Sequence, residues 1–434
     1  MESALSLFLV FVVAFLVFLF SGWLIAFAIA GATILAYVFV AGGGAVGNFA
    51  VHTYNAMLNY DLLALPVFIL MGELLIQGGV AAKLYDSVLP LMERIPGGLV
   101  HTTIAANVIL GACTGSTIAA TTAMSTVAIP ELKKRGYAKE ISYGSLASAG
   151  CLACLIPPSV GMILFASITT VSLGRLFIAG IIPGLILAAA LSLVVAVWVK
   201  VQPRIAPSSS QKIMPLGMAL RFALRNLWPL LILIFLVLGA IYLGIGTPTE
   251  AGCYGVLGAL VLGYKTLDRG ALKTALFGSA QISGALLLVI AMASAYGFAL
   301  NALGLRQWLL ALLDHLPGGP FIQMYIIWFI YLILGMFLDS ASVIVITTPI
   351  CLPFAVNLGY DPVWFGIFLM LAVELGNITP PVGVTLFAVQ VVSKDSLDII
   401  AKGALPFWIS FFLAMTLLTL FPGIVTWLPS TGLG

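Results

Sequence analysis

Two carboxylates, Asp339 and Glu374, stand inside long apolar stretches of this chain. Ionisable groups at membrane depth are costly and are usually functional. Each could neutralise a coupling cation, carry a proton, or orient a helix turn by accepting backbone N–H groups. For Asp339 the structural alternative is a helix cap, because the residue lies where a helix could restart after a turn.

The stretch Glu374–Ala388, ELGNITPPVGVTLFA, surrounds the second carboxylate with small polar residues. Pro380 and Pro381 lack a backbone N–H and therefore leave nearby carbonyls without helical partners. In hydrocarbon such carbonyls must be satisfied by the protein or by a cavity. The pattern predicts a helix broken at mid-membrane whose carbonyls and polar side chains hold an ion or a substrate. The residues expected to supply these side chains and carbonyls are Asn377, Thr379, Gly383 and Thr385.

The same design occurs earlier in the chain, as LACLIPPSVGMILFA. There Pro157 and Pro158, followed by Ser159, precede Pro380 and Pro381 by 223 residues. The same offset links further pairs: Pro130 with Pro353, Gly136 with Gly359, Gly180 with Gly403 and Pro183 with Pro406. This indicates a duplicated unit, and paired breaks in two halves point to the binding site of a secondary transporter. The alternative is a structural kink in a channel or scaffold helix.

Two apolar stretches, 97–130 and 319–355, carry small polar residues at their middle, and we expect each to be a re-entrant hairpin. These polar residues are Thr114, Gly115, Ser116 and Thr117 in the first, and Asp339, Ser340 and Ser342 in the second. Sodium prefers hard oxygen ligands, so two similar ion sites are expected, one at each tip and break. For any single hydroxyl, the alternative is packing or a bond to its own i−4 carbonyl.

The composition indicates an all-α integral membrane protein, because 62% of residues are hydrophobic and 8% are charged. No cleavable signal peptide is expected at the N-terminus. The five cysteines predict no disulfide framework, and we interpret Cys151 and Cys154 as small packing residues. We expect no enzymatic activity, no cofactor, no metal other than a coupling ion, and no nucleic-acid partner.

The predicted organisation is a first repeat at 1–201, a cytoplasmic linker at 202–225 and a second repeat at 226–434. Stretches 141–170 and 362–392 are the broken crossings, and amphipathic helices at the interface are expected at 80–94 and 305–315. The remaining crossings are expected at 4–20, 23–41, 58–78, 175–200, 226–244, 249–264, 277–302 and 404–427.

Positive charge tests this layout. With hairpins counted as non-crossing, one side of the membrane receives sixteen of the 18 lysines and arginines, and the other receives only Arg175 and Arg306. The positive-inside rule makes the charged side cytoplasmic, with both termini outside and the two halves inverted. The loops on that side are 79–96, 131–140, 201–225, 265–276 and 393–403.

These motifs together resemble the large membrane subunit (DctM-type) of tripartite ATP-independent periplasmic (TRAP) transporters, over essentially the whole chain. The segments that carry the resemblance are LLALPVFILMGELLIQGGV, GACTGSTIAATTAMSTVAIPEL, GTPTEAG, GMFLDSASVIVITTPICLP and GYDPVWFGIFLMLAVELGNITPPVGVTLF.

The resemblance implies an elevator-type fold with a scaffold and a moving transport domain that contains both hairpins. It also implies sodium-coupled uptake of an organic acid, such as a C4-dicarboxylate, sialic acid or another sugar acid. Substrate would arrive from a soluble periplasmic binding protein, and a separate four-helix membrane subunit would assist in the bacterial inner membrane. The ion sites would map onto Thr114–Ser116 with Pro157–Ser159, and onto Asp339–Ser340 with Thr379–Gly383.

Three positions depart from the family pattern. The family usually has serine at the place of Thr114, an apolar residue at that of Asn377, and asparagine at that of Thr385. The last two flank the second break and could tune the substrate. Two rival functions stay open: a carrier of similar topology that needs no binding protein, and a channel or an assembly scaffold.

Overall fold

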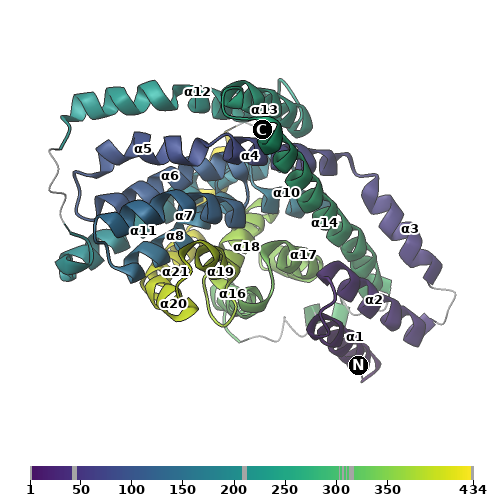
Figure 1. Cartoon of the computed structure of the whole chain (residues 1–434). Helices are drawn as coiled ribbons and strands as arrows, with labels where there is room; N and C mark the ends of the chain where they lie inside the picture. The colour runs from purple at the N-terminus through teal and green to yellow at the C-terminus, as the bar shows by residue number, and fades with distance from the viewer. Residues whose placement is uncertain are drawn as a thin grey trace.

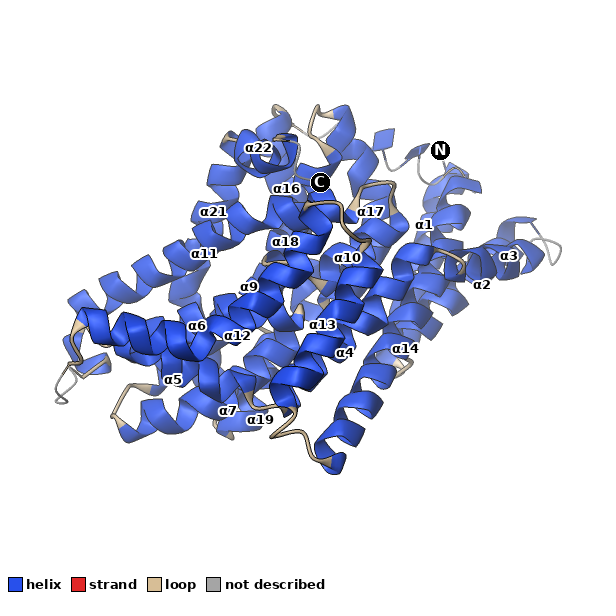
Figure 2. Cartoon of the chain, turned by 90° about the horizontal axis from the view of Figure 1, so that it is seen from above, coloured by secondary structure: helices blue, strands red, loops and turns tan. Residues whose placement is uncertain are grey.

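The computed structural model describes residues 2–41, 46–207, 213–302, 304, 307–308, 310–311 and 317–431. Within these ranges the chain forms helices and no strands (Figure 2), as the composition predicts. By length and composition, seven described helices could cross a membrane, or eight if the bent helix pair Lys139–Leu155 and Val160–Ile168 is one span. The chain is thus a multi-pass membrane protein.

The first half contains α1 to α11 and two short 3-10 helices. They are α1 (Glu2–Phe20), α2 (Ile25–Ala41), α3 (Val46–Met57), η2 (Tyr60–Leu63), α4 (Ala64–Gln77), α5 (Val80–Met92), α6 (Gly98–Thr114), α7 (Thr117–Lys134), α8 (Lys139–Gly150), α9 (Leu152–Leu155), α10 (Val160–Ile168), α11 (Leu173–Val201) and η3 (Pro203–Ile205).

The second half follows the same order: long helices, a hairpin, a broken helix and closing helices. They are α12 (Leu216–Tyr242), α13 (Pro248–Gly263), α14 (Arg269–Ala302), α16 (Pro320–Phe337), α17 (Ser340–Asn357), α18 (Pro362–Asn377), α19 (Val384–Ser393), α20 (Leu397–Ala404), η4 (Leu405–Phe407), α21 (Trp408–Leu420) and α22 (Gly423–Ser430).

The helices form a peripheral layer and a central body (Figure 1). The peripheral layer consists of α1, α2, α3, α4, α12, α13 and α14, in which α14 packs on α2, α3 and α4, and α13 packs on α4 and α12. The hairpin α6–α7, the hairpin α16–α17 and the broken helices make up the body. The body is held by large buried side chains such as Trp364, whose indole N–H donates to the carbonyl oxygen of Leu418 at 2.9 Å.

Local sequence explains where these elements begin. The crossing expected at 249–264 is α13, whose first turn is a capping box between Thr247 and Glu250. The interfacial helix expected at 80–94 is α5. Its expected partner at 305–315 lies mostly outside the described residues. Helix α12 starts at Leu216, inside the stretch 202–225 expected as a linker, because apolar residues recur at helical spacing at Ala219, Ala223 and Leu227.

Two of the seven long apolar helices, α16 and α17, are the arms of the second expected hairpin. Helix α13, expected to cross, has only 16 residues. Length and composition therefore do not distinguish a crossing helix from a re-entrant one, and the inverted arrangement of the two halves remains a prediction.

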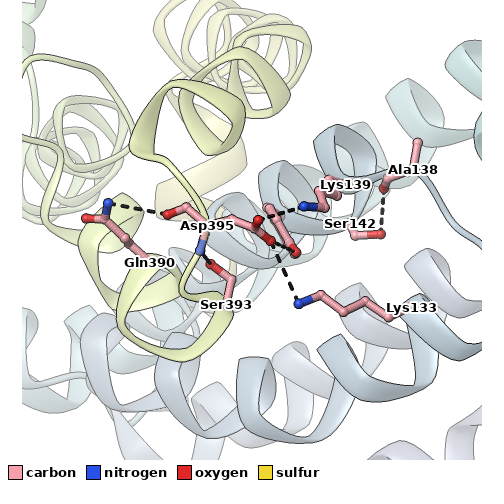
Figure 3. A network of polar contacts seen from close by, with 8 residues as sticks. Lys133, Ala138, Lys139, Ser142, Gln390, Ser393 and Asp395 are labelled. Carbon is pink, nitrogen blue, oxygen red and sulfur yellow. Dashed lines mark hydrogen bonds and ion pairs between the residues drawn. The ribbon is translucent and has the colours of Figure 1, made fainter.

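The five loops that charge assigns to one side do lie together. Thr266 donates to the Gly78 carbonyl at 3.0 Å, and the Ala138 N–H donates to the Ile205 carbonyl at 2.9 Å. Arg135 pairs with Glu93. Asp395, in the loop after α19, pairs with Lys139 at 2.6 Å (Figure 3), which links loop 393–403 to loop 131–140.

Candidate functional site

The tip of the first hairpin is a tight turn between α6 and α7. Gly115 has φ +60°, and a Cβ there would lie 2.5 Å from the Pro158 carbonyl oxygen, so only glycine fits. Ser116 caps α7, because its Oγ accepts the Ala119 N–H at 3.4 Å. Thr114 ends α6 and donates its hydroxyl to the Leu110 carbonyl at 3.1 Å.

The first break lies directly against this tip. Helix α9 ends at Leu155 and α10 begins at Val160, with Pro157 and Pro158 between them, as predicted. The Val160 N–H donates to the Gly115 carbonyl at 3.0 Å, and Ser159 caps α10 through the Met162 N–H at 3.4 Å. Tip and break thus form one unit that holds the N-termini of α7 and α10.

At the second tip, Asp339 is the N-cap of α17. Its carboxylate accepts the N–H groups of Ala341 at 3.1 Å and Ser342 at 3.4 Å, and also the Ser342 hydroxyl. The capping role that the sequence left open is therefore the one the geometry shows. The same side chain borders a cavity described below.

The second break separates α18, which ends at Asn377, from α19, which begins at Val384 after Gly383. The Gly383 N–H donates to the Met336 carbonyl at 3.3 Å, which ties this break to α16. Thr379 donates its hydroxyl to the Leu375 carbonyl at 2.6 Å, and Thr385 donates to the Asn377 carbonyl at 2.7 Å. The bond from Thr379 is to its own i−4 carbonyl, whereas the bond from Thr385 satisfies the Asn377 carbonyl, which Pro381 leaves without a helical donor.

Glu374 joins the two hairpins. Its Oε1 accepts the Thr117 hydroxyl from the first hairpin and the Ser340 hydroxyl from the second, each at 3.0 Å. The Asn377 amide donates to the Ser340 Oγ at 2.6 Å. Glu374 is fully buried. A carboxylate in the second broken helix is therefore the point at which both tips meet.

A cavity of about 160 Å³ opens at this junction. Of the predicted site residues, seven line it: Thr114, Gly115, Ser116, Asp339, Ser340, Glu374 and Asn377. The other eight belong to the two breaks and are not among the residues that line the cavity: Pro157, Pro158, Ser159, Thr379, Pro380, Pro381, Gly383 and Thr385. Its opposite wall comes from α4 and α14, with Glu73, Ile282 and Leu286.

Two functional candidates were missed or left unplaced by the sequence. Glu73, which lies inside the crossing expected at 58–78 and was not among the predicted site residues, lines the cavity from α4. Thr117 was expected at the polar middle of the first hairpin but was not among the predicted site residues, and its hydroxyl donates to Glu374. Among the described residues that line the cavity there is no Lys, Arg or His, so its ionisable groups are acids and one thiol, Cys154.

Family comparison identifies the class of protein that uses this arrangement. The model of the tripartite ATP-independent periplasmic transporter, DctM component, matches residues 12–424. The chain belongs to the DctM family. This DctM chain is 32% identical over 389 residues to the C4-dicarboxylate TRAP transporter large permease protein DctM of Pseudomonas aeruginosa, covering 89% of the chain and 90% of the relative.

A second relative is longer. The sialic acid TRAP transporter permease protein SiaT of Haemophilus influenzae is 28% identical to the DctM chain over 375 residues, which are 86% of the chain and 60% of SiaT. Among solved structures, the YdaH transporter of Alcanivorax borkumensis superposes with a TM-score of 0.58 at 17% identity, covering 90% of the chain and 89% of that structure. At that identity the likeness concerns the fold alone, which is that of a membrane transporter.

Proposed function

We propose that this DctM chain is the large permease subunit of a sodium-coupled importer of a small organic anion. The observation that carries the proposal is the convergence of both hairpin tips on Glu374, beside two broken helices. A break at membrane depth supplies carbonyl ligands for a cation, and helix N-termini attract an anion. Both features occur here at one cavity.

The ion sites belong to the two tips and breaks. In one half the ligands come from Thr114, Gly115 and Ser116 with the break Pro157–Ser159; in the other they come from Asp339 and Ser340 with Thr379–Gly383. Support comes from the hydrogen bonds of Val160 to Gly115 and of Gly383 to Met336, which hold each break against its hairpin. Sodium binding would fix the tips and complete the cavity.

The substrate is proposed to be a C4-dicarboxylate, sialic acid or another sugar acid. Relatives named for C4-dicarboxylate and for sialic acid support an acidic substrate. The N-termini of α7, α10 and α17 lie at the cavity or directly behind it and present partial positive charge. Because the lining acids would repel an anion, bound sodium ions are needed to balance the charge.

Partners and location follow from the family, which normally works with a small membrane subunit and a periplasmic binding protein. We propose a separate four-helix subunit, a soluble periplasmic binding protein, and a site in the bacterial inner membrane with both chain termini periplasmic. The transport domain would contain both hairpins and slide past α4 and α14 once ions and substrate are bound.

The test is uptake of candidate organic acids into proteoliposomes that contain the chain, the small subunit and the binding protein. We expect uptake only with an inward sodium gradient and only with the binding protein. Uptake that is equal in potassium would contradict sodium coupling. Uptake without the soluble protein would support a binding-protein-independent permease instead.

A further inference from the structure

Two hydrogen-bond acceptors at the hairpin junction have no partner. Glu374 uses Oε1 to accept two hydroxyls, but its Oε2 is buried and accepts none. Asn377 donates its amide N–H to Ser340, but its Oδ1 is also buried without a partner. The two residues are 0% and 3% exposed and both border the same cavity. Buried unsatisfied acceptors are rare and need an explanation.

The two acceptors belong to one helix face. Glu374 and Asn377 lie three residues apart on α18, a spacing that places side chains side by side. The nearest thiols, Cys151 and Cys154, supply only weak S–H donors to the Glu374 side chain, and their Sγ atoms also contact the carbonyls of Ala147 and Glu374 and the sulfur of Met370. Because no basic side chain is among the described lining residues, an ionised Glu374 would need a cation to compensate its charge.

The pair has no counterpart in the first half. By the offset of 223, Glu374 corresponds to Cys151 and Asn377 corresponds to Cys154. Hard oxygen ligands in the second half thus face soft thiols at the equivalent positions. An alkali cation selects the oxygens. A site built on Glu374 and Asn377 would therefore be additional to the two tip sites that the repeats share.

We propose that Glu374 Oε2 and Asn377 Oδ1 bind a further monovalent cation, with the hydroxyl oxygens of Thr117 and Ser340 as neighbouring ligands. These hydroxyls already lie 3.0 Å from the Glu374 carboxylate. The cation neutralises the buried carboxylate and closes both hairpins around one charge. The inference rests on the proposed sodium coupling, and the cation is sodium.

The test counts sodium ions bound by the purified full-length chain, using radioactive sodium at equilibrium and no substrate. Glu374→Gln keeps the size of the side chain and an acceptor for Thr117 and Ser340. We expect this variant to bind one sodium ion fewer than the wild-type protein, with the affinity of the remaining ions within about twofold of wild type.

A second variant keeps the carboxylate. Asn377→Leu removes one ligand oxygen, and we expect the half-saturating sodium concentration of this site to rise about tenfold or more. Thr347→Val is the matched control, because Thr347 is buried on α17 and donates to its own i−4 carbonyl, Val343, at 2.7 Å. The control variant should bind the wild-type number of ions with wild-type affinity.

Thermal stability separates this role from a structural one. Without sodium, Glu374→Gln should melt at a higher temperature than wild type, because the uncompensated charge is gone; in saturating sodium the order should reverse. A variant that binds as many sodium ions as wild type would overturn the site. If the variant instead loses a transported proton and binds an unchanged number of sodium ions, the proposed site is also overturned. If wild-type protein binds no sodium at all, the proposed coupling fails together with this inference.

Discussion

The Cys151 thiol lies 3.7 Å from the backbone carbonyl oxygen of Glu374, its equivalent residue in the second half. Residues related by a two-fold axis touch each other only close to that axis. If the halves are inverted repeats, as the sequence predicts, their pseudo-two-fold axis passes close to this contact between the end of α8 and α18. The two broken helices touch at this contact, and Glu374, the only carboxylate of α18, also accepts hydroxyl groups from both hairpins.

The first prediction concerns the first hairpin tip. Gly115→Ala should destabilise the protein by about 1–2 kcal/mol from the left-handed backbone alone. The contact of the new Cβ with the Pro158 carbonyl adds to this, because the break cannot move away without losing the bond from Val160 to Gly115. Melting temperature and sodium-driven uptake should both fall.

The matched control is Gly217→Ala in α12, where a Cβ meets nothing within 4 Å. It should leave uptake unchanged and alter stability by about 1 kcal/mol at most. A Gly115→Ala variant as stable and active as this control would refute the described packing of the tip.

The second prediction concerns sodium affinity. Ser116→Ala and Thr379→Val should each raise the half-saturating sodium concentration, because each removes an oxygen beside a tip or a break. Ser116→Ala also removes a helix cap, with a loss of about 1 kcal/mol in the free energy of unfolding.

Ser172→Ala separates these two effects. Ser172 caps α11 through the Arg175 N–H at 3.4 Å, as Ser116 caps α7, but it lies away from the cavity. It should lower stability by a similar amount and leave the sodium response unchanged. Unaltered sodium dependence in both site variants would show that the ion sites are elsewhere.

A third prediction follows from the shared oxygen of Glu374. Thr117→Val and Ser340→Ala remove one donor each, from different hairpins. Because both donors bind the same atom, their effects on stability should be non-additive by about 0.5 kcal/mol or more. Thr103→Val paired with Ser340→Ala should be additive, since Thr103 donates to the Leu99 carbonyl of its own helix and not to Glu374. Additivity in both pairs would mean that the hairpins are not coupled through this carboxylate.

A fourth prediction concerns pH. Hydrogen bonds from Lys139 and then Tyr143 hold the pKa of Asp395 below its usual value of 3.8 (Figure 3). A lowered folded-state pKa stabilises the protein above the unfolded-state value, and the contribution is lost as the pH falls through the folded-state value. Wild-type stability should therefore contain a component that disappears below about pH 4.

Asp395→Asn should remove that component and lower stability at neutral pH by about 0.2–1 kcal/mol per exposed ion pair. Asp398→Asn is the control, because Asp398 pairs with Lys402 on the exposed face of α20 and links no other loop. Melting curves between pH 3 and pH 7 measure both effects. Identical pH profiles for wild type and Asp395→Asn would exclude this role for the loop contact.

Much of the site could be predicted from single residues. Because proline lacks an N–H, the two helix breaks could be predicted at Pro157–Pro158 and Pro380–Pro381. The distribution of basic residues predicted that five loops lie on one side, and the structure brings these loops together. These inferences succeed because each depends on a local property: a missing donor, a flexible backbone or a charge.

The remaining features depend on contacts between distant segments. Thr117 and Glu374 are 257 positions apart, and nothing local to Thr117 reveals that α18 passes beside it. Glu73 is likewise defined by its place opposite the tips, which only the packing of α4 against the body establishes. Asp339 was ambiguous because capping and cation binding require the same residue type at the same position.

The most direct test of sodium coupling is the melting temperature of the purified chain in sodium against potassium at equal ionic strength. A ligand that binds only the folded state stabilises it by about 1.4 kcal/mol at roughly ten times its dissociation constant. We predict a rise in melting temperature that is specific to sodium, saturates with concentration and shrinks in Ser116→Ala and Glu374→Gln. Equal melting temperatures in the two salts, in the chain alone and in its complex with the small subunit, would contradict the account.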